Sequence, residues 1–85
     1  MLPLNKNYLF RTVTMIYSGE LICEEDDYFI LKKAAWIADT GIWSINLVSC
    51  EFCEVEPYPA EKEVRVFKSG MLDIVEIEKL PLERK

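Results

Sequence analysis

Apolar and polar residues alternate with a period of two from Thr12 to Tyr17, at the start of a β-rich segment that runs from Val13 to Trp36, and this pattern is typical of β-strands. Glycine tolerates positive φ, so Ser18-Gly19 is expected to turn the chain. Four adjacent carboxylates at residues 24–27 repel one another, which favours a solvated loop. The pattern therefore predicts three antiparallel strands, over Thr12–Tyr17, Glu20–Cys23 and Tyr28–Ile37.

The same alternation returns over Val64–Ile77 and turns at Lys68-Ser69-Gly70. It predicts two further strands, Glu61–Phe67 and Met71–Glu78, and hence an all-β chain of five strands. A short, strongly bent antiparallel sheet has many open edges for its size. We therefore expect it to close into a small barrel or to pair with copies of itself.

The segments outside these two parts predict other structure. Pro3–Phe10 is a candidate N-terminal helix, because Pro3 suits the first helical position. Residues 39–58 are expected to form an insertion between strands of a single domain, 1–85. Within this insertion, Ile42–Phe52 fits either a short amphipathic helix or an irregular strand.

Composition and charge limit the possible functions. Of the 85 residues, 51% are hydrophobic, and so short a chain has few interior positions, so a subunit interface is expected. The net charge of −5 argues against a basic surface for duplex nucleic acid, because such binding depends on neutralising phosphates. Without histidine, the commonest general base is missing, and no glycine-rich phosphate loop is present, so we expect no enzyme.

The sequence also indicates a location. No apolar stretch approaches the roughly 20 residues of a membrane helix, and the first residues lack a signal-peptide pattern. Three cysteines, an odd number, fit reduced thiols better than a disulfide framework. We therefore expect a cytoplasmic protein without membrane contact.

Two stretches resemble the sequence motifs of the Sm and Sm-like (LSm) proteins. Residues 13–23, VTMIYSGELIC, and 28–34, YFILKKA, resemble the first motif, with its glycine turn, acidic loop and strand ending near alanine. Residues 64–77, VRVFKSGMLDIVEI, resemble the second motif, in which an apolar strand enters an Arg-Gly turn. The stretch Ala34–Gly41 is also similar to small phage-associated proteins.

Membership of the Sm-like family implies a strongly bent, five-stranded antiparallel barrel with an N-terminal helix. It implies homo-oligomeric rings, usually of six or seven copies, in which the fourth strand of one subunit pairs with the fifth strand of its neighbour. The implied ligand is single-stranded RNA, often rich in uridine, bound around the pore. We expect no cofactor and no metal.

The resemblance also implies RNA-binding residues in two loops. Tyr28 aligns with the family's asparagine and Lys68-Ser69 with its Arg-Gly pair, which predicts Tyr28 and Lys68 as nucleotide contacts. Asp27 and Gly70 would shape the pore loops. Tyr28 can stack on a base but cannot read a uracil edge as an amide does, and Lys68 lacks the bidentate fork of arginine. The ring is therefore predicted more firmly than a preference for uridine.

Other candidate chemistry has a simpler explanation in each case. Cys50 and Cys53 have the spacing of half a zinc site, but buried thiols are more frequent where no histidine is available. The acidic run Glu24–Asp27 offers oxygens to a divalent cation, yet it lacks the glycine that shapes a calcium loop. Trp36 and Trp43 are stacking candidates, although aromatic side chains at such positions more often pack in a core. Basic residues that could touch phosphate are Lys32, Lys33 and Arg65, each of which alone is more often a solvated side chain.

Two principal hypotheses follow. The first is a non-catalytic ring that binds single-stranded RNA or scaffolds RNA–protein complexes. The second, which the acidic charge balance favours, is a protein-interaction ring without a nucleic-acid role, such as a phage accessory protein. A zinc-binding module is a third.

Overall fold

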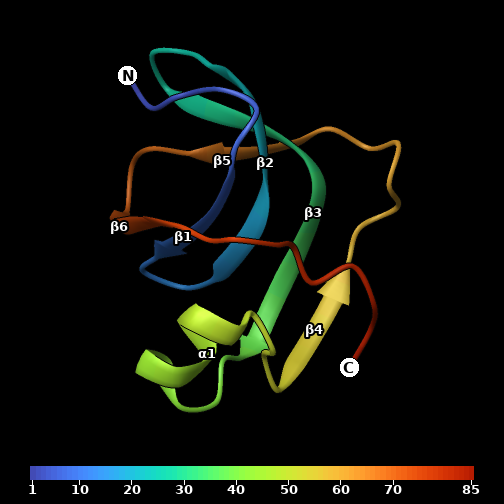
Figure 1. Cartoon of the computed structure of the whole chain (residues 1–85). Helices are drawn as coiled ribbons and strands as arrows, with labels where there is room; N and C mark the ends of the chain where they lie inside the picture. Colours follow the sequence, from blue (N-terminus) through green and yellow to red (C-terminus); the bar gives the residue numbers. More distant parts are fainter.

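The computed structural model describes all of residues 1–85 and consists of antiparallel β-strands with one short helix (Figure 1). This confirms the all-β class that was predicted from the alternation. The elements are β1 (Asn7–Thr12), β2 (Ile16–Glu24), β3 (Tyr28–Asp39), α1 (Trp43–Ser49), β4 (Glu54–Pro57), β5 (Val64–Phe67) and β6 (Met71–Glu76).

The strands form one bent sheet in the order β4-β3-β2-β1-β6, and β5 also pairs with β3. The long strand β3 pairs with β5 through Tyr28–Leu31 and with β4 through Ala35–Asp39, so these two strands follow one another along the same edge (Figure 1). β5 and β6 pair with different strands although a short turn joins them. The expected closed barrel of five strands is therefore wrong: the sheet has six strands and stays open.

The predicted N-terminal helix over Pro3–Phe10 is also wrong, because Asn7–Thr12 forms β1. Tyr8 and Phe10 belong to one buried cluster and Leu9 to another. A strand points successive side chains to opposite faces, so β1 can bury three consecutive apolar residues against two clusters.

The predicted turn at Ser18-Gly19 lies instead inside β2, where Gly19 pairs with Tyr8. A Cβ atom at Gly19 would lie 2.9 Å from the Cβ atom of Leu31, so the glycine allows close packing of β2 on β3. The chain turns earlier, where the N–H of Thr12 donates to the carbonyl oxygen of Met15 at 2.8 Å. The strands predicted later in the chain agree better with the structure. The strands β3, β5 and β6 overlap those predicted over Tyr28–Ile37, Glu61–Phe67 and Met71–Glu78.

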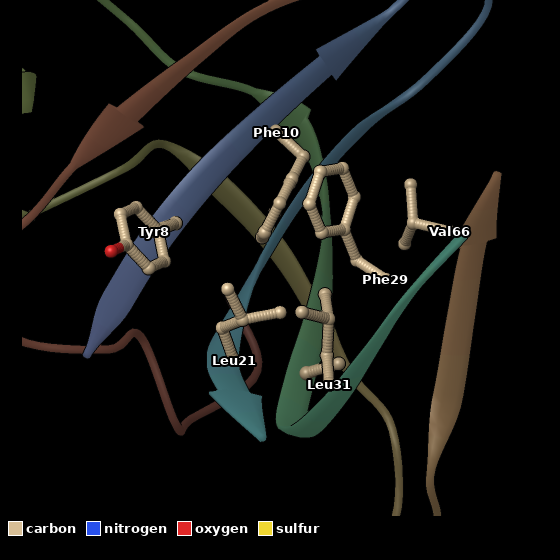
Figure 2. Packing of buried hydrophobic residues seen from close by; sticks show 7 residues of the cluster. Tyr8, Phe10, Leu21, Phe29, Leu31 and Val66 are labelled. Atoms are coloured by element: carbon tan, nitrogen blue, oxygen red, sulfur yellow. The ribbon is translucent and has the colours of Figure 1, made fainter. Parts of the chain in front are cut away.

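Two clusters of buried side chains lie on opposite faces of the sheet. The first fills the inside of the bend, and Figure 2 shows its side chains converging from β1, β2, β3 and β5. Phe10 is fully buried there, with its ring 5.3 Å from that of Phe29. The buried members of this cluster are Tyr8, Phe10, Leu21, Phe29, Leu31, Ala34 and Val66.

The second cluster depends on the insertion at residues 39–58. Phe52 and Val55 are almost fully buried against Leu9 and Ile37, and Trp43 and Leu47 of α1 pack over them. The ambiguous segment Ile42–Phe52 thus contains a helix, which ends where Cys50 adopts a left-handed conformation. The insertion is part of the core and covers the outer face of the sheet.

Candidate functional site

The structure brings three of the four predicted RNA-binding residues into contact at one end of the sheet. Tyr28 begins β3 directly after Asp27, and the carbonyl oxygen of Asp27 accepts a hydrogen bond from the backbone N–H of Lys68 at 2.8 Å. Gly70 lies on the far side of the turn. It has φ of +84°, which favours glycine, and its carbonyl oxygen accepts a hydrogen bond from the N–H of Val13 at 3.0 Å. Gly70 therefore shapes the turn and faces the β1–β2 connection.

Glu24 organises this end of the molecule. Its carboxylate accepts a hydrogen bond from the Lys68 ammonium at 2.8 Å and another from the backbone N–H of Leu2 at 2.9 Å. Only 12% of the Glu24 side chain is exposed, against 32% of the Lys68 side chain, so the carboxylate is the shielded partner of this ion pair. Glu24 thus ties the N-terminal segment to the β5–β6 turn.

The hydrogen bond from Lys68, followed by that from Leu2, holds the pKa of Glu24 below its ordinary value. The carboxylate is therefore charged at neutral pH and neutralises Lys68. The Lys68 ammonium also lies 5.0 Å from the centre of the Phe29 ring. Nucleotide binding by Lys68 stays a prediction. The Lys68 ammonium would have to bind a nucleotide while it is paired with Glu24.

The acidic run therefore divides into two parts that the sequence pattern did not separate. Glu25, Asp26 and Asp27 are exposed, as expected of a solvated loop, whereas Glu24 ends β2 and pairs with Lys68. The available signal was the position of Glu24 directly after a strand, where alternation still decides which way a side chain points.

An aromatic pair with an arginine covers the outer face of β3 and β5. Tyr28 and Phe67 are opposite each other in the register, with ring centres 5.5 Å apart and an edge-to-face geometry. The guanidinium carbon of Arg65 lies 5.6 Å from the centre of the Tyr28 ring, within cation–π range. Sequence analysis selected Tyr28 but not Phe67, because only the pairing of β3 with β5 makes them neighbours.

The remaining candidates are the cysteines and the tryptophans. Cys50 is buried, Cys53 is exposed, and no group of three or more His, Cys, Asp or Glu side chains could hold a metal ion. Trp43 packs on the second cluster with the Arg11 guanidinium 4.9 Å from the centre of its ring, and Trp36 is partly exposed. Trp36 therefore lies away from the Tyr28 pair in the strand register, and Trp43 belongs to α1.

The largest surface hollow, of about 510 Å³, lies between the N-terminal segment, α1 and the end of β6. It contains no cysteine, serine or threonine that could act as a nucleophile. No helix of the chain is both long enough and apolar enough to cross a bilayer.

Comparisons with protein-family models, with curated proteins and with solved structures found no match for this chain.

Proposed function

We propose that this chain is the subunit of an Sm-like homo-oligomeric ring that acts in the cytoplasm, binds single-stranded RNA or scaffolds RNA–protein complexes, and performs no catalysis. The observation that carries the proposal is the arrangement of open strand edges. The sequence resemblance to the two Sm motifs supports the same conclusion independently.

Strands β5 and β6 each pair on one side only, β5 with β3 and β6 with β1. The remaining edge strand, β4, has a partner on its outer side. The N–H of Lys85 donates to the carbonyl oxygen of Val55 at 3.0 Å, and the N–H of Val55 donates to the carbonyl oxygen of Lys85 at 3.1 Å. The C-terminus therefore covers β4, while β5 and β6 keep unpaired donors and acceptors. Two free edges at opposite ends of one sheet are what head-to-tail pairing of identical subunits needs.

Exposed apolar side chains lie beside the β6 edge. Leu72 in β6 is 60% exposed, and Val13 in the neighbouring turn is also exposed. Both line a mainly apolar surface groove of about 340 Å³. Leu72 is the one residue of β6 in this groove, and pairing of β5 from a second copy with β6 would remove part of its apolar surface from water, which favours assembly.

A charge at the β6 edge tests the assembly. We expect Leu72→Lys to shift the protein to smaller species in size-exclusion chromatography, because the ammonium would be buried next to the neighbouring strand. Leu82→Lys is the matched control, since Leu82 is 59% exposed in the C-terminal segment. Equal elution of both variants with the wild type would contradict an interface at β6.

The RNA-binding part is tested by titrating oligouridine and oligoadenine at several salt concentrations. Replacing Lys68 alone would leave the shielded Glu24 carboxylate without a positively charged partner, so Lys68→Gln is compared within a Glu24→Gln background. We expect severalfold weaker binding when the Lys68 charge is removed. Unchanged affinity would show that the Lys68 turn does not contact nucleotide.

A specific surface favours the second candidate, a protein-interaction ring such as a phage accessory protein. Ile42, Ile45 and Val48 lie at helical spacing along α1 and are all exposed, so the insertion presents an apolar stripe. If the assembled protein binds no oligonucleotide even at low salt, this candidate replaces the first.

A further inference from the structure

The basic residues of this acidic chain are not evenly neutralised. Six of the ten lysine and arginine side chains form ion pairs with carboxylates. The four without a carboxylate within ion-pair distance all lie on β3, on β5 or in the loop before β5, and they are Lys32, Lys33, Lys62 and Arg65. The cations without an ion-pair partner therefore lie on the side of the molecule where β3 and β5 pair.

Exposed aromatic surface lies on the same side. Phe67 is 56% exposed and packs edge-to-face on Tyr28, whose ring in turn lies within cation–π range of Arg65. Alternation along β3 places Lys32 on the face that carries Tyr28, because Leu31 between them is buried in the inner cluster. We name these four residues, Tyr28, Lys32, Arg65 and Phe67, the β3–β5 face.

We propose that the β3–β5 face is a further contact surface for single-stranded nucleic acid, which adjoins the Lys68 turn and extends the predicted contact at Tyr28 to Phe67, Arg65 and Lys32. A base stacks on Phe67, and Arg65 and Lys32 contact the flanking phosphates. The proposal extends the proposed function: it rests on RNA binding by this chain but not on the formation of a ring.

The chemistry of the face favours a nucleic acid over another polyanion. An unpaired guanidinium attracts any phosphate or carboxylate, but an exposed ring beside it adds stacking, which only a ligand with π-faces can use. A duplex hides the faces of its bases, so a single strand is the better ligand. Arg65 is the leading cation, since Lys32 is opposite Glu20 in the register of β2 and β3 and is partly offset by that carboxylate.

Variants of the face are compared in binding to a single-stranded RNA 12-mer, with an abasic strand of the same length as a second probe. We expect Phe67→Leu to weaken RNA binding by about fivefold or more, because leucine keeps apolar volume but not stacking. Phe67→Tyr should bind as the wild type does. The abasic strand should bind more weakly than RNA and should not distinguish wild type from Phe67→Leu.

Arg65→Gln should weaken binding and reduce the slope of log affinity against log salt concentration by about 0.7, the value for one phosphate contact on a single strand. Arg84→Gln is the matched control, because Arg84 is exposed but pairs with Glu56 on another part of the surface. This control should leave the affinity and the slope nearly unchanged.

The outcomes separate this inference from the proposed function. If RNA binds and its affinity depends on Lys68 but not on Phe67 or Arg65, the β3–β5 face is excluded and the proposed function stands. If Arg84→Gln weakens binding as much as Arg65→Gln, the attraction is general and the face is again excluded. If no strand binds at low salt, both the face and RNA binding by this chain are excluded.

Discussion

Ser18 and Gly19 lie in the middle of β2, and both are buried. A Cβ atom at Gly19 would lie 2.9 Å from Cβ of Leu31, a side chain that is itself fully buried. We expect Gly19→Ala to lower the free energy of unfolding by about 1–3 kcal/mol, because two strands must move apart. Urea denaturation measures this change. An unchanged or raised stability, as expected for glycine in an exposed site of negative φ, would contradict the assigned packing.

Ser18, the residue before Gly19, provides a control in which stability is expected not to fall. The hydroxyl oxygen of Ser18 is buried and has no hydrogen-bond partner. Ser18→Ala removes an unsatisfied polar atom without adding volume, so we expect stability to stay the same or to rise. A clear loss in the same denaturation experiment would show that the hydroxyl has a partner.

Glu24 predicts a dependence of stability on pH. Since its pKa is lowered in the folded state, its contribution to stability is complete above the unfolded pKa and is lost as pH falls through the folded value. At neutral pH, Glu24→Gln should cost about 1–2 kcal/mol, because a charge-assisted hydrogen bond is weakened. Between about pH 5 and pH 3, the wild type should lose more stability than this variant.

The matched control for this prediction is Glu51→Gln. Glu51 pairs with Lys85 at 2.9 Å, almost the same distance, but both side chains are well exposed. Solvent screens such a pair, so little change in stability is expected at any pH. Both variants are unfolded at one fixed protein concentration. Equal effects of the two variants would show that the shielding of Glu24 is unimportant.

At the scale of single residues, the sequence predicted roles better than partners. The turn at Lys68-Ser69-Gly70 was predicted correctly, because a short turn that ends in glycine is a local property of the sequence. Gly19 was misread, since its role depends on Leu31 across the strand pair. Glu24 and Phe67 were missed for the same reason: their partners, Lys68 and Tyr28, are distant along the chain.

At the scale of elements, the insertion makes a testable contribution to the core. Phe52 is 1% exposed and packs in the second cluster. We expect Phe52→Ala to cost about 3–5 kcal/mol of unfolding free energy, the range for large aromatic residues in a core. Ile45→Ala on the exposed side of α1 should change stability little, so the pair distinguishes core packing from helix propensity. A small effect at Phe52 would mean that the insertion is an appended loop.

The strands with one buried face were predicted well, because alternation identifies them directly. β3 is the clearest example over its first third, Tyr28–Leu31. β1 was missed because the insertion covers its second face, so Tyr8, Leu9 and Phe10 are all buried and the period of two disappears. A continuous apolar run does not separate a two-sided strand from a buried helix.

At the scale of the whole molecule, the sequence predicted open edges but not their location. Which strands remain unpaired depends on long-range pairing: the C-terminal Lys85 covers β4, whereas β5 and β6 stay free. That Lys32 and Arg65 share the β3–β5 face with Tyr28 and Phe67 likewise becomes visible only once the strands are placed side by side. The central claim is that the free edges of β5 and β6 pair with strands of other copies of the same chain.

The most direct test is the mass of the protein in solution, measured by multi-angle light scattering over a range of micromolar concentrations. The account predicts one species whose mass is a multiple of 9.9 kDa and does not change with concentration; six or seven copies give about 59 or 69 kDa. A stable species of 9.9 kDa at every concentration would contradict it.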